Sequence, residues 1–206
     1  EEFGNASSRT HMYGTEAKRY VSNARDQIAR SLDIDPRFVF FTSGATESNN
    51  LAILGLAYSE YSFEKKHIIS TTIEHEAVLE PLQALKKDNF EIDLVSPNEH
   101  GVIDPNHILK KIRKDTLLVS VMHVNNELGT VQPISEIADG LKDSDVFFHV
   151  DAAQSYGKNI NGLAHERIDL ISISGHKIFA PKGVGVLIKK SRNYSSIKLK
   201  PLMYQK

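Results

Sequence analysis

Apolar and polar positions follow a regular pattern along the chain, in which short apolar runs are followed by amphipathic segments of helical length. Within residues 13–32, apolar side chains from Val21 to Leu32 recur three or four residues apart, which predicts one face of a helix. The next run, FVFFT at residues 38–42, is short, aromatic and β-branched, and it predicts a buried strand.

The rest of the chain repeats this alternation. Further strands are predicted at HIIST, EIDLV, LLVSVMH, VFFHV, DLISIS and VGVLIKK, and further helices at ATESNNLAILGLAYSEY, EAVLEPLQALKK, DPNHILKKIRK and PISEIADGLKD. Ser43 or Thr46 is the expected cap of the ATESNN helix. Repeated strand–helix units predict an α/β fold: a mostly parallel seven-stranded sheet with helices on both faces. Only a short turn around Pro181 joins the last two strands, so the last strand is expected to be antiparallel. One domain over residues 1–206 is the simplest organisation.

Composition narrows the classes of function. The chain has 206 residues, 40% of them hydrophobic, and a formal net charge of -1, which gives no electrostatic reason to expect nucleic acid or a membrane surface as a partner. Its apolar runs are of strand length, too short to span a bilayer. Cysteine is absent, so the chain supplies no disulfide, thiolate metal ligand or cysteine nucleophile. A cytoplasmic location is the default expectation.

Polar clusters follow five of the predicted strands. They are Ser43-Gly44-Ala45-Thr46-Glu47-Ser48-Asn49, Thr72-Ile73-Glu74-His75, His123-Val124-Asn125-Asn126-Glu127, Asp151-Ala152-Ala153-Gln154 and Ser174-Gly175-His176-Lys177. In open α/β sheets, ligands bind outside the carboxyl ends of the strands, so these clusters are expected to form one site.

Each cluster alone has an ordinary structural explanation, such as a turn, a helix cap or a solvated lysine. Taken together they match the requirements of pyridoxal phosphate: a helix N-terminus for the phosphate, a flat ring partner in His75, a carboxylate in Asp151, an amide in Gln154 and an amine in Lys177. The carboxylate would face the pyridine nitrogen, and the lysine would form a Schiff base with the cofactor.

Six motifs carry a more specific resemblance. The segments FGNASSRTHMYG, FTSGATESNNLA, EHEAVL, MHVNNELGTVQPI, HVDAAQSYGK and SGHKIFAPKGVGVL resemble, in order, those of the cysteine desulfurases, pyridoxal-phosphate enzymes of fold type I related to the class V aminotransferases. The likeness extends from Phe3 to Pro201. It implies the large cofactor-binding domain of these transferases.

The resemblance also implies individual roles, at the positions that match the motifs. Lys177 would be the Schiff-base lysine and proton shuttle, Asp151 would pair with the pyridine nitrogen, Gln154 with the phenolic oxygen, and His75 would stack on the ring. The phosphate would be held by Ala45, Thr46, Ser174 and His176, and the substrate carboxylate would be oriented by Asn126. The implied reaction converts L-cysteine to L-alanine with sulfur transfer to an enzyme cysteine, for iron–sulfur cluster or other thio-cofactor synthesis. A homodimer and a sulfur-acceptor or scaffold protein are the implied partners.

The chain departs from the family in two ways. Family members begin with a further strand and helix, and they continue into a small C-terminal domain that carries the catalytic cysteine and an arginine for the substrate carboxylate. We therefore expect the chain to correspond to the large domain alone, truncated or split at both ends and inactive by itself.

Three alternatives remain open. One is a selenocysteine lyase or another class V enzyme, and another is an inactive scaffold of the same fold. The third, a metal hydrolase, would use His75, His123, His149 and Asp151, but it leaves Lys177 and the Ser-Gly-Ala-Thr turn unexplained, and no metal site is predicted.

Overall fold

The structure is a computed structural model that describes residues 4–8, 10–192 and 195–204. It divides into two compact units, Glu1–Val39 and Phe40–Lys206. The organisation of residues 1–206 as one domain stays a prediction. No helix in the described ranges is both long and apolar enough to cross a membrane.

The first unit contains helix α1, Met12–Ser31, which confirms the helix predicted over residues 13–32. His11 caps it, because its Nδ1 accepts a hydrogen bond from the Gly14 amide at 3.1 Å. A short 3-10 turn follows at Pro36–Phe38, with proline at its first position, where a missing N–H costs nothing.

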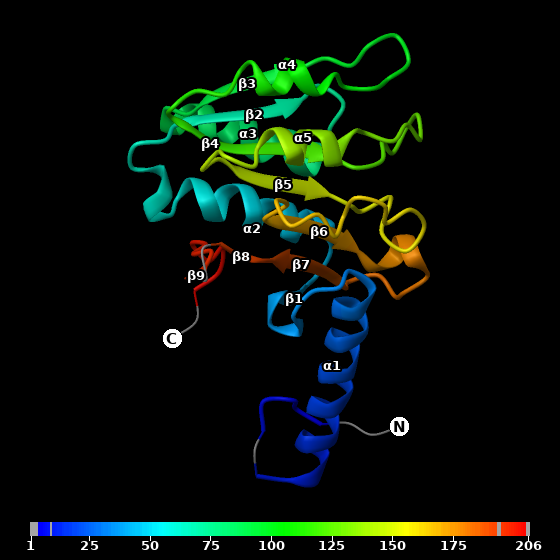
Figure 1. Ribbon diagram of the computed structural model, residues 1–206. Coiled ribbons are helices and arrows are strands. Elements are labelled where there is room, and N and C mark those ends of the chain that lie inside the picture. Colours follow the sequence, from blue (N-terminus) through cyan, green and yellow to red (C-terminus); the bar gives the residue numbers. More distant parts are fainter. Residues whose placement is uncertain (1–3, 9, 193–194, 205–206) are drawn as a thin grey trace. The chain divides into compact units, whose positions relative to one another are not determined.

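The second unit is built on a seven-stranded sheet (Figure 1). Its strands are β1 (Val39–Thr42), β2 (His67–Thr71), β3 (Glu91–Val95), β4 (Thr116–Met122), β5 (Phe147–Asp151), β6 (Leu170–Ser174) and β7 (Gly185–Lys189), in the spatial order β1-β7-β6-β5-β4-β2-β3. The pairs from β3 to β6 are parallel, whereas β6 and β7 are antiparallel. Both features confirm the predicted sheet. A small hairpin, β8 (Ser191–Arg192) and β9 (Ser195–Ser196), follows it.

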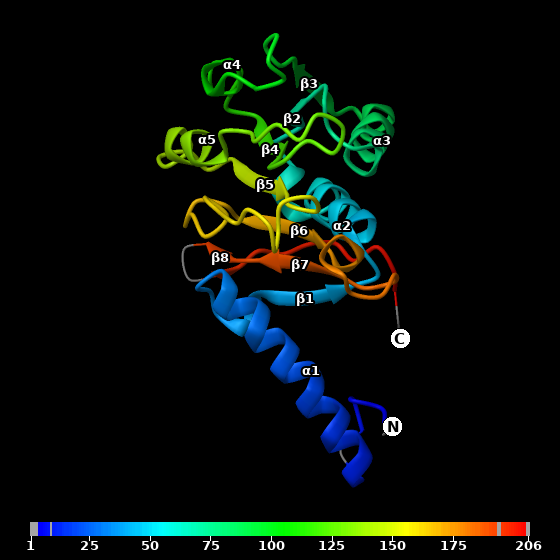
Figure 2. The same cartoon turned by 90° about the vertical axis from the view of Figure 1, so that its right-hand side faces the viewer.

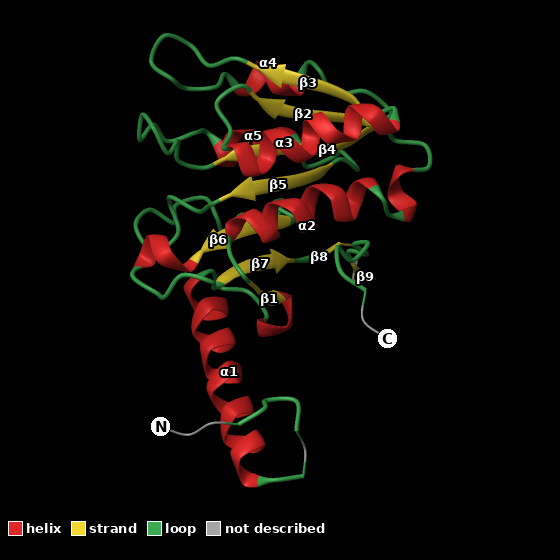
Figure 3. Cartoon of the chain, turned by 180° about the vertical axis from the view of Figure 1, so that it is seen from behind, coloured by secondary structure: helices red, strands yellow, loops and turns green. Residues whose placement is uncertain are grey.

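Helices cover both faces of this sheet. Figures 2 and 3 show α2 (Ala45–Ala57) and α3 (Glu76–Leu85) on one face, and Figure 2 shows α4 (Pro105–Leu109) and α5 (Ile134–Gly140) on the other. Short 3-10 turns lie at Glu60–Ser62, Lys86–Asp88 and Gly175–Ile178. Helix α4 is shorter than the predicted segment DPNHILKKIRK, because the Arg113 amide donates to Thr116 Oγ1 at 2.8 Å and turns the chain into β4.

The core lies between the sheet and the α2–α3 pair. Ile53 and Leu56 of α2, and Val78 and Leu82 of α3, are almost completely buried and pack in one cluster with apolar side chains of the strands. Burying a side chain of this size contributes about 1.5–3 kcal/mol to the stability of the fold, so this packing holds α2 in place against the strands.

The parallel register brings the carboxyl ends of the central strands together. Met122, the last residue of β4, lies opposite Asp151, the last residue of β5, and Asp151 lies opposite Ser172 of β6. The loops that leave these strands carry the polar clusters of the sequence, and they emerge at one edge of the sheet. At the opposite edge, where these strands begin, the polar contacts hold the sheet together.

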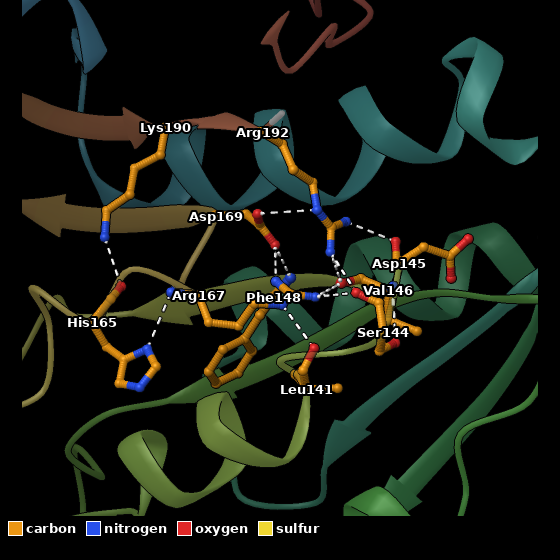
Figure 4. A network of polar contacts seen from close by, with 10 residues as sticks. All are labelled: Leu141, Ser144, Asp145, Val146, Phe148, His165, Arg167, Asp169, Lys190 and Arg192. Atoms are coloured by element: carbon orange, nitrogen blue, oxygen red, sulfur yellow. Dashed lines mark hydrogen bonds and ion pairs between the residues drawn. The ribbon is translucent and has the colours of Figure 1, made fainter. Parts of the chain in front are cut away.

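At that opposite edge, a buried ion pair holds the entry to β5 (Figure 4). The Arg167 guanidinium donates to Asp169 Oδ2 at 2.7 Å, to Leu141 O at 2.9 Å and to Val146 O, and the Phe148 amide donates to the same Asp169 oxygen at 2.7 Å. Both charged side chains are nearly inaccessible to solvent. A buried pair with its remaining polar atoms satisfied is costly to break from one side, since the other charge is left uncompensated.

Replacing Asp169 with alanine should therefore destabilise the protein strongly. Asp169→Ala leaves Arg167 buried without its carboxylate and the Phe148 amide without its acceptor, and a loss of about 3–5 kcal/mol in the free energy of unfolding is expected from denaturant titration. The control is Asp115→Ala, which breaks an exposed pair with Arg113 and should cost much less. Equal, small losses for both variants would show that the buried network does not hold this edge.

Candidate active site

The predicted site residues meet in one pocket of about 490 Å³ at the carboxyl edge of the sheet. The lining includes all nine residues selected from the sequence: Ala45, Thr46, His75, Asn126, Asp151, Gln154, Ser174, His176 and Lys177. It also includes Ser43, Gly44, Asn49, Ala77, Met122, Val124, Glu127 and Ala153. Side chains far apart in the chain therefore share one cavity, whereas the chemical roles assigned to them stay predictions.

The start of α2 differs from the prediction. Neither Ser43 nor Thr46 caps the helix: the N-cap residue is Gly44, and no side chain caps this end. Instead, the amide and hydroxyl of Ser43 both donate to Glu47 Oε2, at 2.7 and 2.6 Å, and these bonds lower the pKa of Glu47. The prediction was wrong because the helix begins at Ala45, which puts Gly44 at the N-cap position, with Ser43 before it and Thr46 already inside the helix. The first turn of α2 therefore lines the pocket with its N–H groups uncovered by a capping side chain, as anion-binding helix ends do.

A close backbone contact sets the position of this helix end. A Cβ atom added to Gly185, the first residue of β7, would lie 2.5 Å from the Cα of Gly44 and 2.8 Å from the Ile173 carbonyl. Only glycine fits at this point. The missing side chain at Gly185 allows the α2 N-terminus to approach the β6–β7 end of the sheet, where Lys177 also lies.

Lys177 lies in the 3-10 turn Gly175–Ile178, directly after β6. Phe179 ends this turn with φ of 66°, in the left-handed region that residues other than glycine seldom adopt, and the Ala180 amide closes it onto Gly175 O at 3.1 Å. Lys177 is half-buried and lines the pocket. The turn therefore holds the lysine at the strand end instead of leaving it on an open loop.

Asp151 is the buried carboxylate of the pocket, with 5% of its surface exposed. Burial raises its pKa, while hydrogen bonds to Oδ1 from the Ala153 amide, at 2.9 Å, and to Oδ2 from Asn49 Nδ2, at 2.7 Å, act in the opposite direction. Carboxylates accept such bonds best when ionised. The surroundings therefore combine a low dielectric with donors that favour the charged form.

The remaining predicted residues are held by local contacts. His75 is the N-cap of α3, where its Nδ1 accepts from the Ala77 amide at 3.0 Å, so the ring has a fixed orientation at the pocket wall. Ser174 Oγ and His176 Nδ1 are paired at 2.8 Å. Asn126 donates to Glu127 Oε1 at 3.0 Å and is exposed, as expected for a residue at the mouth of the site.

The histidines of the metal-hydrolase alternative do not meet. His149 lies inside the sheet, where Ser120 and Ser172 hydroxyls contact its two ring nitrogens at 2.8 and 2.9 Å, and burial lowers its pKa to about 3. Burial likewise lowers the pKa of His123 to about 4. Neither lines the pocket, and within the described residues no three potential ligands are arranged to hold a metal. The geometry disfavours metal-dependent hydrolysis.

Glu74 is a second buried carboxyl beside the site. Its Oε1 accepts from Thr71 Oγ1 at 2.7 Å and from the Met122 amide at 2.9 Å, which links the ends of β2 and β4. Its Oε2 is buried and has no partner among the described residues. Burial raises the pKa of Glu74 to about 8, and the negative charge of Asp151 adds to this effect. At neutral pH the Glu74 carboxyl is therefore protonated and adds no negative charge beside Asp151.

Comparison with known proteins agrees with this geometry. The family model for class-V aminotransferases matches residues 1–204. This chain belongs to the class-V aminotransferase family. It is 48% identical over 185 residues, or 90% of its length, to cysteine desulfurases IscS from Vibrio campbellii (strain ATCC BAA-1116) and Azotobacter vinelandii (strain DJ / ATCC BAA-1303), of which it covers 46%. The predicted resemblance to cysteine desulfurases is confirmed.

Solved structures show the same relationship. DndA from Streptomyces lividans aligns with all of this class-V chain at a TM-score of 0.92 and 49% identity, and the match covers 57% of DndA. SspA, solved in complex with cysteine, aligns with 98% of the chain at a TM-score of 0.88 and 40% identity, with 57% of SspA covered. The chain spans about half the length of the curated relatives it matches.

Sequence reasoning placed Asn49 and Glu74 in two of the polar clusters but assigned a role to neither. Asn49 lies four residues after Ala45, one helical turn into α2, so the spacing places both on one helix face. That spacing could have identified Asn49. Glu74 gives no comparable signal, since a glutamate before a helix looks like a solvated residue, and its burial depends on the crossing of β2 and β4.

The raised pKa of Glu74 predicts a specific pH dependence of stability. In the unfolded chain the carboxyl loses its proton near pH 4.5, whereas the folded protein keeps it until about pH 8. The unfolded state thus binds fewer protons between these values, so stability falls as pH rises across that window and then levels off. Glu74→Gln has no carboxyl to titrate, so its free energy of unfolding should not fall for this reason. The difference in free energy of unfolding between Glu74→Gln and the unsubstituted protein should therefore shift in favour of the variant by a few kcal/mol between pH 4.5 and about pH 8. Denaturant titrations from pH 4 to pH 9 measure it, and a stability difference that does not change with pH would contradict the neutral, buried state.

Proposed function

We propose that this chain is the cofactor-binding part of a pyridoxal-phosphate-dependent cysteine desulfurase. The observation that carries the proposal is the meeting of Lys177, the buried Asp151 and the uncapped N-terminus of α2 in one pocket. An amine, a carboxylate and a helix end are the three groups that this cofactor requires for attachment, for its ring nitrogen and for its phosphate. The membership of the class-V family and the desulfurase relatives support it.

The residues of the pocket fit pyridoxal phosphate chemically. A buried carboxylate without a cationic partner is costly, and the Asp151 side chain, at the pocket wall, would gain one in the pyridinium nitrogen. The α2 N-terminus, with Ala45 and Thr46, and the Ser174–His176 pair would hold the phosphate, and His75, fixed as a helix cap, would stack on the ring. When bound, the cofactor supplies an electron sink for the carbanion at the substrate α-carbon.

The chain's own residues have distinct tasks in this proposal. Lys177 would hold the cofactor covalently and would move a proton at the substrate α-carbon. Gln154, in the pocket lining, would donate to the phenolic oxygen of the cofactor, and Asn126, at the exposed mouth of the pocket, would orient the substrate carboxylate. L-cysteine is the proposed substrate, which is supported by the relative SspA in its complex with cysteine. A homodimer, a sulfur-acceptor protein and a cytoplasmic location stay predictions.

The covalent attachment can be tested directly. Incubation of the protein with pyridoxal phosphate, followed by borohydride reduction and peptide mass spectrometry, should place one pyridoxyl adduct on Lys177, because this lysine is held in the pocket. Lys177→Ala should abolish the adduct, while Lys182→Ala, a change on the exposed turn outside the pocket, should leave it in place. An adduct on a different lysine, or none in the folded protein, would rule out the assignment and favour an inactive scaffold.

Sulfur release should need a thiolate that this chain does not contain. Persulfide formation on an enzyme requires a cysteine, and the 206 residues include none. With pyridoxal phosphate, L-cysteine and a reductant, the chain alone should therefore release no sulfide above background in a colorimetric assay. Cysteine desulfurase IscS from Azotobacter vinelandii serves as the positive control under the same conditions. Alanine and sulfide produced at an enzymatic rate by the chain alone would refute the thiolate-dependent mechanism, and pyruvate would indicate a β-elimination lyase.

A further inference from the structure

The side chain of Asn49 joins α2 to the end of β5. It is completely buried, it lines the pocket, and its Nδ2 donates to Asp151 Oδ2 at 2.7 Å across a separation of 102 residues. The other carboxylate oxygen, Oδ1, accepts from the Ala153 amide at 2.9 Å. Asp151 thus has one donor from its own strand end and one from the opposing helix.

The orientation of the Asn49 amide follows from chemistry. Its Oδ1 is buried without a partner among the described residues. Turning the amide over would place this oxygen against Asp151 Oδ2, which would set two acceptors against each other, whereas the observed orientation satisfies the carboxylate. In this orientation one buried acceptor of Asn49 stays unpaired while Asp151 keeps a donor.

Helix α2 carries both the phosphate-binding end and this donor. Ala45 begins the helix, and Asn49 follows one turn later, on the same face. A displacement of α2 would move the proposed phosphate seat and the support of Asp151 together. The helix therefore fixes the distance between the two ends of the proposed cofactor site.

Several charged or titratable groups surround Asp151 in the pocket. His75 follows β2, and Lys177 and His176 follow β6; all three line the pocket with Asp151, and Glu74 interacts with it through space. Of these, His75 acts to lower the pKa of Asp151, whereas burial acts most strongly to raise it. Asn49 is a neutral donor, so its contribution does not depend on the protonation of any neighbour.

We propose that Asn49 is a positioning residue that keeps Asp151 ionised and oriented, and that it thereby keeps the ring nitrogen of pyridoxal phosphate protonated. The second part of this inference, the protonation of the ring nitrogen, rests on the proposed function. Its first part concerns only Asn49 and Asp151 and can be tested without cofactor.

The first experiment titrates the Asp151 carboxyl carbon by ¹³C NMR in the cofactor-free protein. Asn49→Ala, and Asn49→Leu as a variant of similar branched shape without hydrogen-bonding atoms, should both raise the titration midpoint of Asp151 by roughly one pH unit, because a donor to the charged form is lost. Asn50→Ala is the matched control: this neighbouring side chain donates to Thr46 O at 2.9 Å, does not line the pocket, and should leave the midpoint unchanged. A midpoint that stays in place in both Asn49 variants would overturn the inference.

The second experiment follows the ring nitrogen in protein loaded with ¹⁵N-labelled pyridoxal phosphate. The unsubstituted protein and Asn50→Ala should show the ¹⁵N chemical shift of a protonated pyridine at neutral pH, and both Asn49 variants should move it toward the unprotonated value. Identical shifts in all four proteins would overturn the role of Asn49 while leaving the cofactor proposal intact. Failure of the unsubstituted protein to bind the cofactor would instead overturn the proposed function and the second part of this inference, and the Asp151 titration would still decide the first.

Discussion

In the proposed function, the site depends on keeping one carboxylate charged inside the protein. Asp151 is almost fully buried, and burial favours its neutral form, so the fold must supply compensation. Two hydrogen bonds provide part of it, from Ala153 and Asn49. The nearby carboxyl of Glu74 stays protonated to about pH 8, which spares Asp151 a second negative charge beside it. An ionised Asp151 would suit the pocket to a cationic heterocycle.

The sheet supplies the geometry that this arrangement needs. Parallel pairing in register brings the ends of β4, β5 and β6 to one edge, and the close contact of Gly44 with Gly185 allows α2 to begin there. The apolar cluster under α2 and α3 then holds the helix against the strands. At the far edge, the Arg167–Asp169 pair secures the start of β5, so the strand that ends in Asp151 is held at both ends.

Much of this could be predicted from the sequence because the signals are local and repeated. Each apolar run became a strand, and the polar clusters after the strands line one pocket, since the end of a parallel strand has a fixed location in such a sheet. The start of α2 was mispredicted because Gly44 takes the N-cap position in place of a neighbouring hydroxyl residue, which propensity does not reveal. Asn49 and Glu74 were placed in the polar clusters but given no role, because their importance lies in long-range partners, Asp151 and Met122, that only the assembled sheet brings close.

The central claim is that the pocket binds pyridoxal phosphate through Lys177. The most direct measurement is the visible absorption spectrum of the purified protein after incubation with the cofactor and removal of the excess. We expect a yellow protein whose visible band is retained in Lys182→Ala and absent in Lys177→Ala, because Lys177 lines the pocket and Lys182 does not. A colourless unsubstituted protein, or a band that survives in Lys177→Ala, would contradict it.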